Sequence, residues 1–108
     1  MGDQSPFDHN QIDDVIHGRI RLGVVAYLSA VESALFGELR DQVGATDGNL
    51  SAHLRKLEDA GYVQAEKSFV NRKPQTRLSL TANGRKAWGV WLDRMDALRK
   101  AAGNKLPK

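Results

Sequence analysis

The sequence predicts an α+β fold that is mostly α. Apolar residues recur at helical spacing over four segments, whereas residues 63–66 and 76–80 alternate between apolar and polar side chains. Glycine or a good N-capping residue lies at most boundaries between these segments. The chain has 108 residues, of which 41% are hydrophobic and 27% are charged, and this size and composition are typical of one globular domain.

The first helical segment follows residues 1–9, which are largely polar and are expected to form a flexible arm. Asn10 is a favourable N-cap, and apolar residues recur with helical periodicity from Ile12 onwards. Gly18 interrupts this run, so we expect it either to bend the helix or to divide it, with a second part over residues 19–29. Residues 34–36 are apolar and are enough for one short strand.

Two helices joined by a tight turn are predicted next. Gly37 is an acceptable N-cap for a two-turn helix, which Gly44 ends as a left-handed residue. Thr46 caps the following helix, about residues 47–60. The apolar face of this helix is formed by Leu50, Leu54 and Leu57. Because the connection is so short, the two helices must pack at a sharp angle, as in a helix-turn-helix.

A β-hairpin and a last helix complete the pattern. Alternation in residues 63–66 and 76–80 predicts two short strands, joined by a long basic tip over residues 69–75. Thr81 caps the last helix, and residues 103–108 are expected to fray. The apolar stripe of this helix is Trp88, Trp91, Leu92, Met95 and Leu98. This order of elements is that of a winged helix-turn-helix with a β-hairpin wing and an additional C-terminal helix, in one domain over residues 10–102.

The helix at about residues 47–60 has the surface that reading a DNA major groove requires. The side opposite its leucines carries small, polar and basic residues that can approach base edges. The candidate DNA-binding residues of this helix and its cap are Thr46, Gly48, Asn49, Ser51, Ala52, Arg55 and Lys56. Asn49 matches the edge of adenine, Arg55 that of guanine, and Lys56 suits a phosphate. The alternative is an ordinary solvated helix face.

The wing, about residues 68–76, favours the DNA-binding interpretation. Arg72, Lys73 and Arg77 crowd this region, although folding does not need these charges and like charges repel each other. A neighbouring phosphate backbone would explain them, whereas the alternative is a solubilising loop. Residues 55–108 also hold thirteen of the sixteen Lys and Arg but five of the thirteen Asp and Glu, which indicates a half that faces a polyanion. Double-stranded DNA is therefore the predicted partner.

The run from Leu50 to Val63 resembles the recognition-helix signature of MarR-type and ArsR-type winged-helix transcriptional regulators. Residues 46–49, 71–76 and 80–85 narrow the resemblance to a compact single-domain branch related to the MarR type. The resemblance implies a repressor that acts as a homodimer through its first and last helices. The candidate interface residues are Ile12, Ile16, Trp88, Trp91, Met95 and Leu98. It also implies a packing or capping role for His53. Relatives often have Ser or Thr at Gly37, which leaves the start of the second helix open.

Other classes of protein find little support. There is no cysteine and no close group of metal ligands, so we expect no metal and no cofactor. No phosphate-binding loop and no nucleophile-base-acid set are present, and the chain is predicted not to be an enzyme. No apolar run approaches the roughly 20 residues that a bilayer requires, so we expect a cytoplasmic protein.

Two alternatives remain open. A winged helix can serve as a protein-interaction module in a larger assembly without DNA binding, but such modules commonly lose the basic residues that this chain keeps. Trp88 and Trp91 are most simply anchors of the core or of a dimer interface. Since related regulators bind apolar effectors between such helices, a small apolar effector beside these rings is the second alternative.

Overall fold

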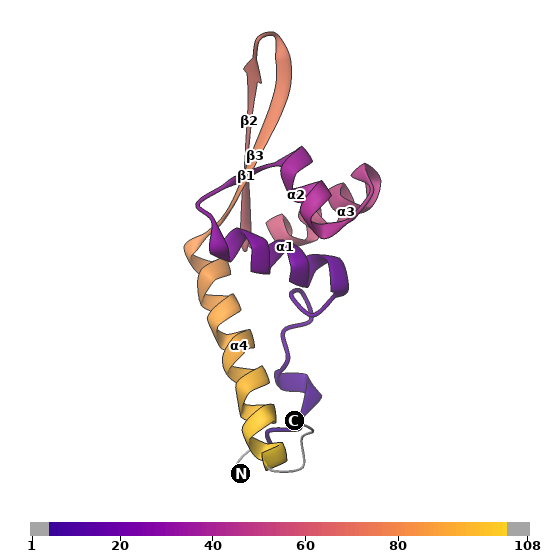
Figure 1. The fold of residues 1–108 in the computed structure, drawn as a ribbon. Coiled ribbons are helices and arrows are strands. Elements are labelled where there is room, and N and C mark those ends of the chain that lie inside the picture. The colour runs from indigo at the N-terminus through magenta and orange to yellow at the C-terminus, as the bar shows by residue number, and fades with distance from the viewer. Residues whose placement is uncertain (1–4, 104–108) are drawn as a thin grey trace.

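The computed structural model describes residues 5–103, and from residue 19 onwards its elements follow the predicted order (Figure 1). The elements are the 3₁₀ helix η1 (His9–Gln11), α1 (Arg19–Ala30), β1 (Ala34–Leu35), α2 (Phe36–Val43), α3 (Asp47–Asp59), β2 (Val63–Val70), β3 (Lys73–Leu80) and α4 (Ala82–Ala102). The strands form one antiparallel sheet in the order β1-β3-β2. The fold is a winged helix, as predicted. Residues 1–4 of the predicted arm and 104–108 of the predicted tail lie outside the described residues.

The core lies between α1, α2, α3 and the base of the sheet. Its buried side chains are Ile16, Val24, Val25, Leu28, Ala34, Leu39, Leu50, Leu54, Leu57, Val63, Leu78 and Leu80. The leucines of α3 are among them, at the helical spacing that predicted their burial. In the sheet, Val63 pairs with Leu80 and Ala65 with Leu78, so the predicted inward face of the hairpin is confirmed.

Residues 12–17 do not form the predicted helix, and Asp13 supplies the reason. One oxygen of its carboxylate accepts hydrogen bonds from the amides of Val15 at 2.8 Å and Ile16 at 3.2 Å, which closes a turn instead. The other oxygen accepts from the Tyr62 hydroxyl at 2.6 Å. This hydrogen bond, with partial burial, raises the pKa of Tyr62 to about 12. The turn is thereby anchored to the segment between α3 and β2.

The caps of the N-terminal elements also differ from the prediction. Asn10 lies inside η1, and the side chain of Asp8 caps that helix by accepting from the Asn10 amide. Gly18 neither bends nor divides a helix, because residues 12–17 form none; it is extended and is the N-cap of α1, which begins at Arg19 as predicted for the second part. No helix of residues 5–103 has the length and apolar character that would let it cross a bilayer.

The start of α2 is two residues earlier than predicted. Leu35 is still paired with Arg77 in β1, and it is also the N-cap of α2, so the chain passes directly from strand to helix. The prediction that Gly37 is the cap is therefore wrong, since Gly37 lies in the first turn. The end of the helix is as predicted, because Gly44 has a φ of 67° and a ψ of 36°.

The hairpin is longer, and its loop shorter, than predicted. β2 and β3 stay in register from Val63 opposite Leu80 to Val70 opposite Lys73, which leaves a loop of two residues, Asn71 and Arg72. The predicted tip over residues 69–75 is therefore mostly paired strand. Proline is tolerated within β3 because β1 pairs only with Arg77 and Leu78, so the outer part of β3 is an edge strand.

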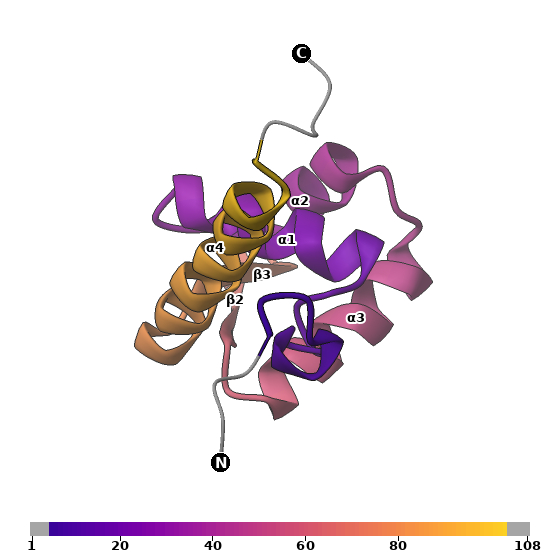
Figure 2. The same ribbon diagram turned by 90° about the horizontal axis from the view of Figure 1, so that it is seen from below.

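The last helix, α4, begins at the predicted cap and then leaves the domain. The Thr81 hydroxyl accepts from the Gly84 amide at 2.9 Å and donates to the Gly61 carbonyl at 2.6 Å. Figure 1 shows α4 running away from the wing, with the N-terminal segment beside it, and Figure 2 shows the same pair from below. The molecule is consequently elongated, with extents of 57 × 35 × 23 Å.

Candidate nucleic-acid interface

The outward face of α3 is exposed. The predicted DNA-binding residues of α3 and its cap are all exposed: Thr46, Gly48, Asn49, Ser51, Ala52, Arg55 and Lys56. The leucines on the other side fasten the helix to the core. This arrangement presents polar, small and basic side chains to a partner without disturbing the packing below them.

Two side chains organise the N-terminus of α3. Thr46 caps it, with its hydroxyl accepting from the Asn49 amide at 3.1 Å. Arg40 of α2 donates to the carboxylates of Asp47 at 2.9 Å and Asp41 at 3.1 Å, and these contacts raise the pKa of Arg40. Arg40 thus partly offsets the negative charges of Asp47, at the end of the helix that would enter a groove, and of Asp41 in α2. Sequence reasoning missed this residue, because its partner lies beyond the turn, seven positions away.

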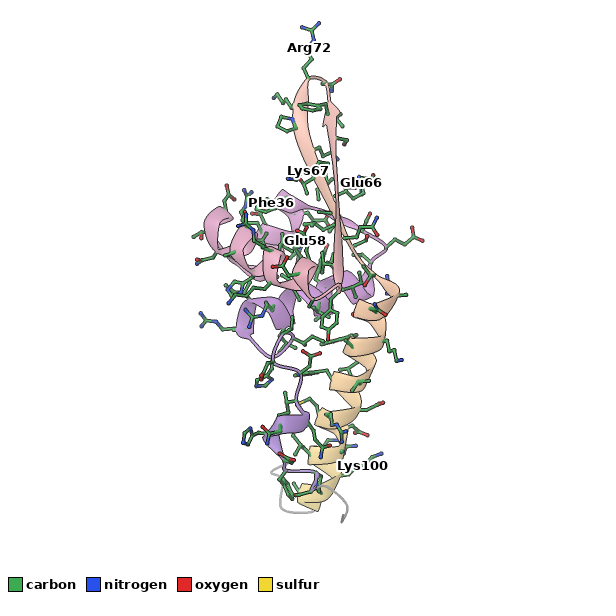
Figure 3. The ribbon with its side chains drawn as sticks, turned by 180° about the vertical axis from the view of Figure 1, so that it is seen from behind. Phe36, Glu58, Glu66, Lys67, Arg72 and Lys100 are labelled. Atoms are coloured by element: carbon green, nitrogen blue, oxygen red, sulfur yellow. The ribbon has the colours of Figure 1, made fainter. Side chains whose placement is uncertain are left out.

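The tip of the wing is strongly basic and narrow. Asn71 and Arg72 have φ values of 52° and 66°, which is the left-handed geometry of a two-residue hairpin turn. Asparagine adopts this conformation readily, whereas glycine would suit the second position better than arginine does. Arg72 therefore places a long cationic side chain at a position where the backbone conformation favours glycine. Its side chain points outward, beyond the end of the hairpin (Figure 3). Lys73 follows it and is also exposed.

A shared groove connects α3 with the wing. A cavity of about 410 Å³ lies between them, lined by Phe36, Ser51, Leu54, Arg55, Glu58, Asp59, Ala65, Lys67, Thr76 and Leu78. Figure 3 shows Phe36, Glu58 and Lys67 around this region, with Arg72 far out on the hairpin. Two cations, Arg55 and Lys67, face the groove, and two carboxylates lie near the C-terminal end of α3. The lining therefore carries both signs of charge, and its carboxylates are confined to the last turn of α3.

Arg77 is set apart from the other predicted DNA-binding residues. It lies near the base of β3, paired with Glu66 of β2 and Leu35 of β1. In the alternation of the strand it faces away from the buried Leu78, and its guanidinium donates to the Ser33 hydroxyl at 2.9 Å. The structure thus brings Arg72 and Lys73 together at the tip but holds Arg77 against the loop before β1.

His53 lies on the inward flank of α3, where it contacts α1. The guanidinium of Arg21 donates to its Nδ1 at 2.9 Å and to the carbonyl of Val15 at 2.6 Å. Because an arginine can only donate, Nδ1 must be an unprotonated acceptor. Burial, followed by the positive charges of Arg21 and Lys56, lowers the pKa of His53. His53 therefore packs and positions the helix, the role that the resemblance implied.

The residues predicted for a dimer interface fall into two groups. Ile16 is fully buried in the core, so its prediction as an interface residue is wrong. Ile12, Trp88, Trp91, Met95 and Leu98 are half-buried along the N-terminal segment and α4. Leu92, which belongs to the predicted stripe, is 44% exposed.

The two tryptophans of α4 are stacked, with ring centroids 5.4 Å apart and an angle of 7° between the planes. Trp91 also contacts the His17 ring, and its Nε1 is buried without a hydrogen-bond partner in the described part of the chain. An effector that bound between the rings would have to separate this stack.

Comparison with known proteins agrees with this geometry. The chain matches the winged helix DNA-binding domain family over residues 20–100. It is also 34% identical to an uncharacterized protein of Methanocaldococcus jannaschii over 74 residues, which are 68% of this chain and 80% of that protein. The residues that match the family, 20–100, include α3, both strands of the wing and nearly all of α4.

Solved structures show the same fold. A transcriptional regulator homologue from Pyrococcus horikoshii OT3 has a TM-score of 0.84 and 24% identity, over 93% of this chain and 99% of that chain. A MarR family transcriptional regulator from Streptomyces coelicolor, solved in complex with DNA, has a TM-score of 0.68 and 20% identity, over 92% of this chain and 69% of that chain.

A basic wing beside an exposed, leucine-backed helix defines a winged-helix DNA-binding protein. The chain belongs to the winged helix DNA-binding domain family, a class of DNA-binding domains and not of enzymes. The predicted resemblance to MarR-type regulators is confirmed at the level of the fold.

Proposed function

We propose that this protein is a sequence-specific regulator of transcription that binds double-stranded DNA. In this proposal α3 lies in the major groove, and the wing contacts the phosphate backbone or the minor groove beside it. One observation carries the proposal: α3 and the hairpin line a single groove, with exposed cations on both. Because the proposed partner is chromosomal DNA, we also propose a cytoplasmic location. We further propose that the DNA-binding domain spans residues 10–102, which include the helices and the hairpin.

Each exposed residue has a role in this proposal. Asn49 and Arg55 read base edges, because their side chains match the two hydrogen-bonding positions of adenine and guanine respectively. The remaining polar residues hold phosphates, the small residues let the helix approach closely, and the tip binds the backbone. The phosphate-binding residues are Thr46, Ser51, Lys56, Arg72 and Lys73, and the small ones are Gly48 and Ala52. Arg77 is left out, because it is held against Ser33.

The alternative of a protein-interaction module fits the surface less well. A protein partner would have to cover the cations of α3 and of the wing, and burying an unpaired charge is costly. These side chains are all exposed and protrude, and the described part of the chain gives Arg55, Lys56, Arg72 and Lys73 no acidic partner within ion-pair distance. A polyanion satisfies them directly.

We propose further that the protein acts as a homodimer and as a repressor. The N-terminal segment and α4 project from the domain side by side, and they carry half-buried apolar side chains along their length. A two-fold axis through this projection would place two recognition helices about one DNA turn apart, or ~34 Å, in adjacent major grooves. A dimer bound across such a site represses by occupying DNA that the transcription machinery needs.

Selection of binding sites from random duplex DNA at physiological salt tests the function. We expect enrichment of one sequence with two-fold symmetry and half-sites about 10 base pairs apart. Repeating the selection with Arg55→Ala should relax the preference at one base pair of each half-site, by ~1–3 kcal/mol, and should leave the rest of the site unchanged. Failure of the wild-type protein to enrich any duplex would contradict the proposed function.

Light scattering tests the dimer separately. The wild-type protein is expected to have a mass of twice 11.9 kDa. Met95→Glu with Leu98→Glu should reduce it to one chain, because two carboxylates would have to be buried in the interface. Asp93→Lys, at an exposed position of the same helix, is the matched control and should remain dimeric. A wild-type mass of one chain would exclude the homodimer while leaving DNA binding intact.

A further inference from the structure

The outer half of the wing exposes apolar side chains that the cationic tip does not explain. Phe69 is 77% exposed and Val70 is 49% exposed, and they stand immediately before Asn71 and Arg72. Every residue from Glu66 to Pro74 is exposed, so no other part of the described chain covers this half of the hairpin. An exposed phenylalanine of this kind forgoes the free energy of burying its ring, so its position near the tip points to a partner.

The strand register places Phe69 on the face that looks toward α3. Side chains two residues apart share a face, so Val63, Ala65, Lys67 and Phe69 lie on one face of β2. Their partners on β3 are Leu80, Leu78, Thr76 and Pro74. The first two pairs pack on the core, and Ala65, Lys67, Thr76 and Leu78 line the cavity beside α3. Phe69 and Pro74 are the next pair outward on this same face.

We propose that the Phe69 ring, supported by Pro74, is an apolar DNA contact that packs against deoxyribose surfaces of the minor groove. This inference rests on the proposed function and adds a hydrophobic contact to the electrostatic ones. The walls of the minor groove expose the C–H surfaces of the sugars, and side chains such as phenylalanine and proline are used at this groove by other DNA-binding proteins. Phosphates flank these sugars, within reach of neighbouring cations.

Charge around the ring decides in favour of DNA over an apolar protein surface. Lys67 precedes Phe69 on its face, while Arg72 and Lys73 follow it at the tip. A protein that covered the ring would also have to desolvate these cations, whereas the minor groove offers apolar sugars between two rows of phosphates. Lys67 shares the face of Phe69, Arg72 lies in the turn just beyond it, and Lys73 lies opposite Val70 on the other face, so the outer hairpin offers both kinds of contact to one partner.

The contact is tested by measuring duplex binding of Phe69→Ala at several salt concentrations, using the operator found by selection. We expect the dissociation constant to rise about tenfold at every concentration, since burial of the ring is a hydrophobic contribution. The slope of log affinity against log salt should stay the same, because no phosphate contact and no counterion release is lost. Phe69→Leu should recover most of the affinity.

Val70→Ala is the matched control. Val70 precedes the turn as Phe69 does and is also exposed, but it lies on the opposite face of β2. We expect the affinity of the Val70→Ala variant for the operator to stay within twofold of the wild-type affinity. Because both side chains lie outside the core, the melting temperatures of both variants should match the wild type, which excludes unfolding as the cause.

Equal effects of the two substitutions, or an altered salt slope for Phe69→Ala, would overturn the inference. If the wild type binds the duplex and Phe69→Ala binds it equally well, the proposed Phe69 contact is wrong, while the proposed function stands. Absence of any duplex binding by the wild type would instead count against the proposed function.

Discussion

Replacement of Arg72 and Lys73 by alanine is expected to weaken operator binding roughly 60-fold for each protomer at ~0.1 M salt. Both side chains are exposed at the end of a hairpin that projects from the domain, and neither packs on the core. Each neutralised phosphate contributes about 0.9 to the slope of log affinity against log salt, so one contact is worth about eightfold at ~0.1 M relative to 1 M. Two lost contacts should also flatten the slope by about 1.8 for each protomer.

The measurement is a titration of fluorescent operator and of a scrambled duplex at several salt concentrations. Both duplexes should lose affinity alike, because the phosphate backbone carries no sequence information. Arg99→Ala with Lys100→Ala is the matched control, since it removes the same charge from the far end of α4 (Figure 3). Similar losses in the two double variants would show that net charge, and not the wing, governs binding.

Gly84→Ala is expected to destabilise the protein by about 3 kcal/mol, at the upper end of the effects of overpacking. A Cβ atom on Gly84 would overlap the carbonyl oxygen of Tyr62 and lie 3.2 Å from Cδ2 of Leu80. The carbonyl cannot move aside easily, because it accepts the amide of Thr81 at 3.0 Å, and the Tyr62 hydroxyl is bound to Asp13. The first turn of α4 would have to shift away from the sheet.

Denaturant unfolding of the wild type and of this variant measures the difference in free energy. Gly89→Ala is the control in the same helix, because a Cβ atom there would meet nothing within 4 Å. It should stabilise the protein by about 0.5–1 kcal/mol, the usual advantage of alanine over glycine inside a helix. If Gly84→Ala proved as stable as Gly89→Ala, the first turn of α4 would not need to approach the Tyr62 carbonyl as closely as the structure shows.

Most of the fold and much of the candidate interface could be predicted from the sequence, because they depend on local features. Thr46 and Thr81 cap helices through their own hydroxyls, and Gly44 ends α2 in a left-handed conformation. The leucine spacing of α3 determines which of its faces is buried, and therefore which residues are offered to DNA. Each of these features involves residues within a few positions of each other.

The predictions failed where local patterns had two solutions. Helical periodicity continued through residues 12–17, but the carboxylate of Asp13 competes for the backbone amides and is held by Tyr62, 49 positions away. Polar residues with a proline suggested a loop at the wing, although the register of β2 and β3 continues to Val70 and Lys73. In the first case a partner remote in the sequence decided the outcome, and in the second the pairing of the two strands continued into a segment whose composition is typical of a loop.

The sequence by itself determined the order of the elements, the buried faces of the helices and the basic character of the wing, because backbone periodicity, capping and composition are local properties. Only the tertiary structure decided that α3 and the wing share one groove, that Arg77 is held against Ser33, and that Phe69 faces the side of α3. These relations depend on strand register and on close contacts between distant segments, which the packing of the whole domain sets.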